Sequence, residues 1–200
     1  MNRSAIIILA AGSSSRYGGI KQLLMFNEKP LLQHAIDEAI NSGANLVVAV
    51  TGANSVEVLK GINAKKVITI SNERWQQGMA SSIVAGVKKA RTVDNDIENI
   101  IIAVCDQPYI SADLFKKLYS VKNESKKGIV ASSYADTIGT PVLFTQKYFE
   151  ALMSLGGDEG AKKILKANAG DVVTVAFHQG NIDIDTEQDY QQLLKEDRGS

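Results

Sequence analysis

Short apolar segments alternate with longer amphipathic segments over most of the chain. An almost continuous apolar run is typical of a strand buried on both faces, and apolar residues three or four positions apart are typical of a helix. The apolar runs predict strands at Ala5–Leu9, Leu46–Thr51, Lys66–Ile70, Ile100–Val104, Gly128–Ser132 and Val172–Phe177. The amphipathic pattern predicts helices at about Pro30–Ser42, Ser55–Gly61, Met79–Thr92, Ser111–Lys122, Gln146–Leu155, Glu159–Ala167 and Thr186–Lys195.

The alternation of strands and helices indicates the fold class. Strands that alternate with helices form a mostly parallel sheet with helices on both faces, so we expect a three-layer α/β/α domain. Ligands bind beyond the carboxyl ends of the strands in such sheets. The segment Tyr134–Phe144 carries no helical pattern, and we expect it to form short strands, as an antiparallel excursion over the site.

Length and composition narrow the class of protein. The chain has 200 residues, which suits one domain. Its 22 Lys and Arg residues balance 22 Asp and Glu residues, and a net charge of zero argues against a general nucleic-acid or membrane-surface binder. A single cysteine excludes an intrachain disulfide and a cysteine-based zinc site. The sequence shows no apolar stretch as long as a membrane span and no signal-peptide pattern, so we expect a cytoplasmic protein.

A loop rich in small residues follows the first predicted strand. Residues Leu9–Lys21 read L-x-A-G-x-S-x-R-x-G-x-x-K. Small residues let the backbone approach a polyphosphate, and Arg16 and Lys21 supply positive charge. The spacing matches neither the dinucleotide fingerprint G-x-G-x-x-G nor the Walker loop. The alternative is a tight turn whose Arg16 and Lys21 side chains only face solvent.

A carboxylate follows the strongly apolar strand Ile100–Val104, in the turn Cys105-Asp106-Gln107-Pro108. A carboxylate at the mouth of a central strand suits Mg²⁺, which prefers oxygen ligands and substrate phosphates. The alternative is that Asp106 caps the next helix, but Ser111 is the better N-cap. We expect Cys105 to be a small buried side chain rather than a nucleophile, since no base is identifiable nearby.

The segment Asn72–Ser82 connects a predicted strand to a predicted helix. Gly78 precedes the helix, and Ser81 and Ser82 fall in its first turn. Free N–H groups and hydroxyls at a helix N-terminus can bind a base edge or a phosphate. Plain capping of the helix by these serines is an equally simple interpretation. Trp75 can stack on a ring or cover an edge of the core.

Together these segments resemble those of the molybdenum cofactor nucleotidyltransferases, and most closely the cytidylyltransferase branch. The resemblance covers nearly the whole chain. It rests on Leu9–Lys21, Asn72–Ser82, the Asp-Gln-Pro turn, and further blocks at Gly139–Phe144, Gly157–Lys162 and Asp183–Thr186. It implies one nucleotidyltransferase domain over residues 1–200, with a Rossmann-like sheet of the nucleotide-diphospho-sugar transferase type.

The resemblance also implies a reaction and its residues. CMP would pass from CTP to the terminal phosphate of the molybdopterin cofactor with release of pyrophosphate, assisted by Mg²⁺ or Mn²⁺. The nucleotide would be bound by Leu9, Ala10, Ala11, Gly12, Ser13, Ser14, Arg16, Lys21, Gly78, Ser81 and Ser82. Arg16, Lys21 and Asp106 would be catalytic, and Asp106 and Asp185 would hold the metal. The acceptor would be bound by Pro141, Asp158, Gly160 and Lys162.

The acidic block near the C-terminus has a simpler interpretation. Asp185 and Thr186 can open the last predicted helix without any role in metal binding. Thr186 followed by Asp189 fits a capping box only loosely, because the favoured partner is Glu or Gln. Asp183 is a weaker candidate for the metal site than Asp185.

Two positions on the acceptor side depart from the family pattern, with Thr140 in place of an expected His and Lys162 in place of an expected Arg. A lysine keeps the charge but loses the planar fork that grips a phosphate. Guanylyl transfer to the same cofactor and transfer to a sugar or alcohol phosphate therefore stay open. A non-catalytic cofactor carrier and a nicotinamide-dependent oxidoreductase are alternatives of other classes. The expected partners are small-molecule substrates, with a molybdoenzyme or its maturation chaperone.

Overall fold

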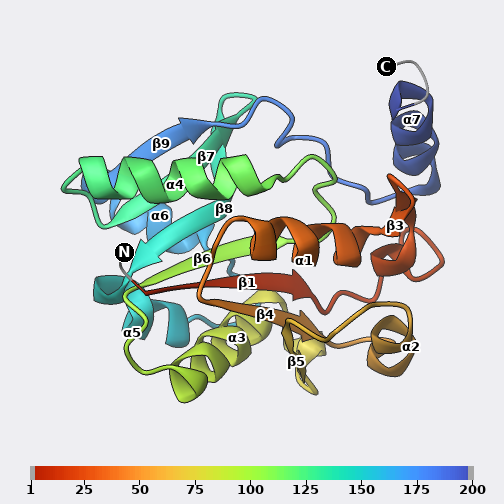
Figure 1. Cartoon of the computed structure of the whole chain (residues 1–200), viewed down its shortest axis with the longest axis horizontal. Helices are drawn as coiled ribbons and strands as arrows, with labels where there is room; N and C mark the ends of the chain where they lie inside the picture. The colour runs from red at the N-terminus through yellow and green to blue at the C-terminus, as the bar shows by residue number, and fades with distance from the viewer. Residues whose placement is uncertain (1–2, 198–200) are drawn as a thin grey trace.

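A single central sheet sets the position of the other elements. In the computed structural model, which describes residues 3–197, seven strands form one sheet in the order β5-β4-β1-β6-β8-β7-β9 (Figure 1). The strands are β1 (Ser4–Ala10), β4 (Leu46–Thr51), β5 (Ile68–Ser71), β6 (Asn99–Val104), β7 (Ile129–Tyr134), β8 (Thr137–Thr145) and β9 (Val172–Ala176). Each of the predicted strands overlaps one of these, so the predicted strands are confirmed.

The strand β1 shows why an uninterrupted apolar run forms the middle of the sheet. It pairs in parallel with β4 and with β6, and Ile7 lies opposite both Val48 and Ile102. All 7 residues of β1 are buried. Its side chains alternate between the two core clusters because successive residues of a strand point to opposite faces.

Helices cover both faces of the sheet, which confirms the predicted three-layer α/β/α architecture (Figure 1). One core cluster takes residues from α1 (Leu31–Asn41), α2 (Ser55–Lys60) and α4 (Ala112–Glu124). The other takes residues from α3 (Met79–Val93), α5 (Phe149–Met153) and α6 (Lys162–Ala167). Short 3-10 turns are η1 (Lys21–Leu23), η2 (Trp75–Gln77), η3 (Gln146–Tyr148) and η4 (Ala169–Asp171).

The strand β8 corrects the expectation of short strands over the site. It is one strand of 9 residues inside the sheet, antiparallel to both β6 and β7. Val142, Leu143 and Phe144 are fully buried, as the side chains of an interior strand must be. Because β8 runs opposite to β6, its first residues reach the edge at which β1 and β6 end.

The C-terminal helix α7 (Glu187–Asp197) stands apart from the two helix layers, beside the small hairpin of β2 (Met25–Phe26) and β3 (Lys29–Pro30) (Figure 1). Phe26, Leu31, Ile184 and Leu193 form a separate apolar cluster there. This cluster brings the acidic block before α7 back to the loop that follows β1. Among the helices within residues 3–197, none combines the length and apolar character needed to cross a membrane.

Candidate active site

A cleft of about 1040 Å³ opens at the carboxyl edge of the sheet. Its walls come from the loops after β1 and β6, the start of α3, the start of β8, the region around the start of α6, and the segment before α7. The predicted site residues that line it are Leu9, Ala10, Ala11, Gly12, Ser13, Arg16, Lys21, Gly78, Ser82, Asp106, Asp158, Gly160, Lys162 and Asp185. The tertiary structure therefore collects most of the predicted residues in one place.

The loop after β1 turns at Ser14, whose φ is 56°. The Ser14 carbonyl oxygen accepts hydrogen bonds from the amides of Tyr17 at 3.0 Å and Gly18 at 3.1 Å. Its hydroxyl accepts from the Lys21 amide and donates to Gln22 Oε1, both at 3.3 Å. Ser14 thus shapes the loop from within and does not line the cleft, which departs from the expectation that it contacts a nucleotide.

Gln22 is a loop-supporting residue that sequence reasoning missed. Its side chain is buried, and Nε2 donates to the carbonyl oxygens of Ala10 at 3.0 Å and Gly12 at 2.8 Å. Both carbonyl groups therefore point toward Gln22, and these hydrogen bonds hold the loop after β1 in place. An uncharged polar residue directly after the motif lysine was the available signal.

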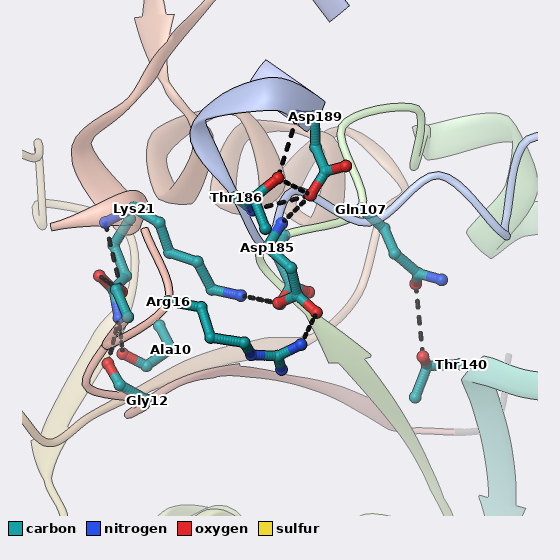
Figure 2. Close-up of polar contacts among 12 residues, drawn as sticks. Ala10, Gly12, Arg16, Lys21, Gln107, Thr140, Asp185, Thr186 and Asp189 are labelled. Carbon is teal, nitrogen blue, oxygen red and sulfur yellow. Dashed lines mark hydrogen bonds and ion pairs between the residues drawn. The ribbon is translucent and has the colours of Figure 1, made fainter. Parts of the chain in front are cut away.

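Lys21 lies at the centre of an ion-pair network (Figure 2). Its Nζ donates to Asp106 Oδ2 at 2.6 Å and to Asp185 Oδ1 at 3.0 Å. Arg16 Nη1 lies 3.0 Å from the other carboxylate oxygen of Asp185. The Lys21 side chain is 13% exposed and that of Arg16 is 74% exposed. Lys21 is thus the enclosed cation of the network, and Arg16 lies at its rim.

The electrostatics of the site reflect crowded carboxylates. Burial lowers the pKa of Lys21, but the Asp106 charge and hydrogen bonds to Asp106 and Asp185 outweigh it, so the pKa lies above its usual value. Burial, followed by the charges of Asp106 and Asp185, raises the pKa of Asp183 to about 6. The Asp183 carboxyl therefore holds its proton more tightly than a solvent-exposed aspartate does.

Gln107 holds the turn that carries Asp106. Its side chain is 2% exposed. Nε2 donates to the Gly180 carbonyl oxygen at 2.7 Å. Oε1 accepts from Thr140 Oγ1 at 3.3 Å (Figure 2). The buried amide thus ties the end of β6 to β8 and to the segment after β9, a role that the sequence did not reveal.

Two alternative roles are open to this turn: Asp106 as the cap of the next helix, and Cys105 as a nucleophile. Ser111 Oγ accepts from the Leu114 amide at 3.2 Å, so Ser111 caps α4 as predicted. Burial raises the pKa of the Cys105 thiol to about 12, which keeps the thiol protonated near neutral pH. The prediction that Cys105 is a buried side chain is confirmed.

Thr186 and Asp189 form the cap of α7 (Figure 2). The Thr186 amide and hydroxyl donate to Asp189 Oδ2 at 2.7 and 2.8 Å, and the Asp189 amide donates back to Thr186 Oγ1 at 3.2 Å. This is a capping box with Asp at the place usually taken by Glu or Gln. Because these residues make the cap, the Asp185 carboxylate is directed at Lys21 and Arg16 instead.

Gly78 brings the start of α3 against the loop before α6. Its φ of 95° and ψ of 178° lie in a region that is essentially restricted to glycine. A Cβ atom there would lie 2.5 Å from the Gly157 carbonyl oxygen and would also collide with the Asp158 side chain. The close approach of these two segments therefore depends on glycine.

The two serines of the first α3 turn differ in position. Asn72 Nδ2 donates to Ser81 Oγ at 2.8 Å and to Ser82 Oγ at 3.0 Å. Ser81 Oγ also donates to the Gly78 carbonyl oxygen at 2.8 Å and does not line the cleft. Because no side chain among residues 3–197 accepts a hydrogen bond from the first turn of α3, the helix-capping alternative is wrong, and the Ser81 hydroxyl instead bonds to carbonyl oxygens of its own segment. Ser82 lines the cleft but is nearly fully buried.

The residues expected to bind the acceptor also differ in part from expectation. Pro141 is buried in β8, where its carbonyl oxygen accepts from Ser132 Oγ at 2.8 Å, and its neighbours Gly139 and Thr140 line the cleft in its place. Tyr134, at the end of β7, lines the cleft and was missed. Its position at the carboxyl end of a predicted strand was the signal that could have found it.

Exposed lysines from α6 form one wall of the cleft. Lys162, Lys163 and Lys166 line the cleft with exposed side chains. Lys163 Nζ donates to Glu159 Oε2 at 2.7 Å, one helical turn earlier. These three side chains are exposed, unlike that of the enclosed Lys21.

Asp106 and Asp185 are the carboxylates that converge on one point. Among residues 3–197, no group of three or more His, Cys, Asp or Glu side chains is arranged to hold a metal ion. Mg²⁺ commonly takes only one or two carboxylates and completes its coordination with water and substrate phosphates. The oxygen donors of Asp106 and Asp185, beside the loop after β1, fit that chemistry.

Relatives of known sequence match along most of the chain. The purine catabolism protein PucB of Bacillus subtilis strain 168 and the nicotine blue oxidoreductase of Paenarthrobacter nicotinovorans are each 28% identical, with 94% of this chain and 95% of theirs covered. The molybdenum cofactor cytidylyltransferase of Escherichia coli strain K12 is 26% identical, with 92% of each covered.

A solved structure supports the same grouping. Protein Rv0371c of Mycobacterium tuberculosis H37Rv superposes with a TM-score of 0.86 at 26% identity, over 97% of this chain and 98% of that one. Residues 6–172 match the family described as the MobA-like NTP transferase domain. The chain therefore belongs to the MobA-like NTP transferase domain family and is a nucleotidyltransferase.

Proposed function

We propose that this protein transfers CMP from CTP to the terminal phosphate of the molybdopterin or molybdenum cofactor, and that residues 1–200 act as one nucleotidyltransferase domain. The observation that carries the proposal is the convergence of Arg16, Lys21, Asp106 and Asp185 at the loop after β1. Cationic groups and carboxylates gathered at the carboxyl edge of a parallel sheet suit a nucleoside triphosphate and its metal ion.

The reaction is an exchange of phosphoanhydride partners. A phosphate oxygen of the acceptor attacks the α-phosphorus of CTP, and the bond between that phosphorus and the β-phosphate bridging oxygen breaks to release pyrophosphate. Such transfers need positioning and charge stabilisation rather than a nucleophilic side chain. Lys21 stabilises charge at the α-phosphate, and the exposed Arg16 neutralises the leaving pyrophosphate.

Asp106 and Asp185 are the residues that would hold Mg²⁺ or Mn²⁺. A bound divalent ion neutralises phosphate charge and fixes the triphosphate for in-line attack. Asp183 also lines the cleft and stays a weaker candidate for the metal site than Asp185. Rv0371c has also been crystallised as a complex with manganese, so Mn²⁺ is the second cation to test.

The acceptor is the part of the proposal with the least specific support. Asp158, Gly160 and Lys162 line the acceptor side, together with Thr140. The Escherichia coli cytidylyltransferase, which matches 92% of this chain, is the relative whose reaction motivates this choice of acceptor. We further propose a cytoplasmic location and delivery of the product to a molybdoenzyme or its maturation chaperone.

Pyrophosphate release would test this function directly. The assay contains Mg²⁺, purified molybdopterin cofactor and one of CTP, GTP, ATP or UTP, and release with CTP alone is expected. Asp106→Ala should abolish release, whereas Asp37→Ala removes a carboxylate that pairs with Lys29 outside the cleft and should retain it. Release with GTP alone would assign guanylyl transfer, and no release with any nucleotide would contradict the proposal.

Redox chemistry is the second candidate, because a relative named nicotine blue oxidoreductase matches over 94% of this chain. The loop after β1 lacks the G-x-G-x-x-G spacing of a dinucleotide site. A titration with NADH separates the candidates, since nucleotidyl transfer predicts no saturable NADH binding at concentrations at which CTP binds.

A further inference from the structure

The Lys21 ammonium lies between Asp106 and Asp185, the two carboxylates proposed to hold the metal ion. Asp106 Oδ2 and Asp185 Oδ1 are 2.6 and 3.0 Å from the same nitrogen atom. A divalent ion of the Mg²⁺ type approaches carboxylate oxygens to about 2.1 Å. An ion that contacts both of these oxygens from the side on which Nζ lies overlaps with Nζ, and on that side the two cations exclude each other.

Burial makes this exclusion stronger than an ordinary surface ion pair would. The Lys21 side chain is 13% exposed and that of Asp106 is 22% exposed. A partly buried ammonium cannot leave its carboxylates without another anion, because an unpaired charge in such a site is strongly unfavourable. The phosphates of a bound nucleotide are the anion that the neighbouring loop is built to present.

We propose that Lys21 is an internal counter-ion that occupies the metal position in the nucleotide-free protein, so that a divalent cation binds tightly only after a nucleotide phosphate has drawn Lys21 away. This inference rests on the proposed function for the place of the metal and the phosphates. Nucleotide and cation then raise each other's affinity by the same factor, because linkage between two binding sites is reciprocal.

The exposed Arg16 provides the internal comparison. It pairs with Asp185 Oδ2 at 3.0 Å but is 74% exposed and does not bridge the two carboxylates. Loss of Arg16 removes one positive charge from the same carboxylate without vacating the metal position. The Arg16 variant therefore separates two explanations of a change in metal affinity: the loss of a nearby positive charge, and the removal of Lys21 from the metal position.

The test measures Mn²⁺ binding to the nucleotide-free protein. Binding is monitored through the electron paramagnetic resonance signal of the Mn²⁺ that stays free. Lys21→Met keeps the aliphatic stem and should bind Mn²⁺ about tenfold more tightly than the wild type, a coupling of ordinary size. Arg16→Gln should change the affinity by no more than about threefold. Lys29→Met, which breaks an exposed pair with Asp37 outside the cleft, should leave it unchanged.

A second measurement uses only the wild-type protein, in case the Lys21 variant does not fold. Mn²⁺ affinity is compared with and without α,β-methylene-CTP, an analogue that cannot release pyrophosphate, with the Mn²⁺–nucleotide complex in buffer as the blank. Binding of Mn²⁺ should tighten by about tenfold in the presence of the analogue.

The outcomes separate this inference from the proposed function. Equal Mn²⁺ affinity of wild type and Lys21→Met without nucleotide would overturn the counter-ion role while leaving the metal site in place. An equal gain in Arg16→Gln would also overturn it, in favour of a general charge effect. Failure of both proteins to bind Mn²⁺ with or without nucleotide would overturn the metal assignment itself, and the inference with it.

Discussion

The two sides of the cleft carry positive charge in different ways. On the side of the β1 loop, Lys21 is 13% exposed and is held by two carboxylates. On the side of α6, Lys162, Lys163 and Lys166 are exposed and solvated. An enclosed charge is fixed in place by its partners, whereas an exposed lysine contributes little to stability and loses rotamer freedom when it binds. We therefore expect a preorganised β1-loop side, proposed to bind the nucleotide, and an adaptable α6 side, proposed to bind the acceptor.

The largest expected effect is at Lys21. Lys21→Met should lower the turnover of the nucleotidyl transfer by about 10²–10³-fold, the size typical of one preorganised electrostatic stabiliser. The measurement is kcat for pyrophosphate release under saturating substrates. Lys163→Met, an exposed lysine of the same cleft, should stay within about twofold. Undiminished turnover of Lys21→Met would mean that the enclosed lysine contributes no more to catalysis than the exposed lysines of α6.

A substitution at Gly78 would test whether the contact between the start of α3 and the loop before α6 needs glycine. Gly78→Ala should lower the free energy of unfolding by about 1–3 kcal/mol, because the φ of 95° is strained for alanine and its Cβ would meet the Gly157 carbonyl. Urea denaturation measures the change. Gly156→Ala is the matched control, since a Cβ there has no neighbour within 4 Å, and it should change stability by less than about 0.5 kcal/mol.

Gln107 ties the turn after β6 to the segment after β9 and to β8 through hydrogen bonds to Gly180 and Thr140. Gln107→Ala should lower the free energy of unfolding by about 1–2 kcal/mol, because the Gly180 carbonyl loses its partner. Thermal unfolding followed by circular dichroism measures this loss. Gln192→Ala on the exposed face of α7 is the control, and equal unfolding curves for the two variants would contradict the role of Gln107 as a clamp.

The smallest effect is expected on the adaptable side. Lys162→Met should raise KM for the acceptor by about tenfold and leave KM for CTP unchanged, because one exposed charge-assisted contact is lost. Steady-state kinetics with each substrate varied in turn separate the two constants. A rise in KM for CTP instead would place Lys162 on the nucleotide side and remove the distinction.

The sequence by itself determined the features that depend on local pattern. Apolar runs identify β1, β4 and β6 because an interior strand needs apolar residues on both faces. The small residues of the β1 loop and the carboxylate after β6 could be assigned to the same edge, because parallel strands end together. Ser111 as the cap of α4 also follows from local chemistry.

Only the tertiary structure decided which side chains meet. Lys21 pairs with carboxylates 85 and 164 residues away. The separate apolar cluster that contains Leu193 brings Asp185 back to the loop after β1, and no short stretch of sequence predicts that contact. β8 enters the sheet because its apolar residues are buried between β6 and β7, which no local pattern specifies. Ser14, Ser81 and Pro141 make hydrogen bonds within the protein and do not line the cleft, and the partners in these bonds are set by the fold.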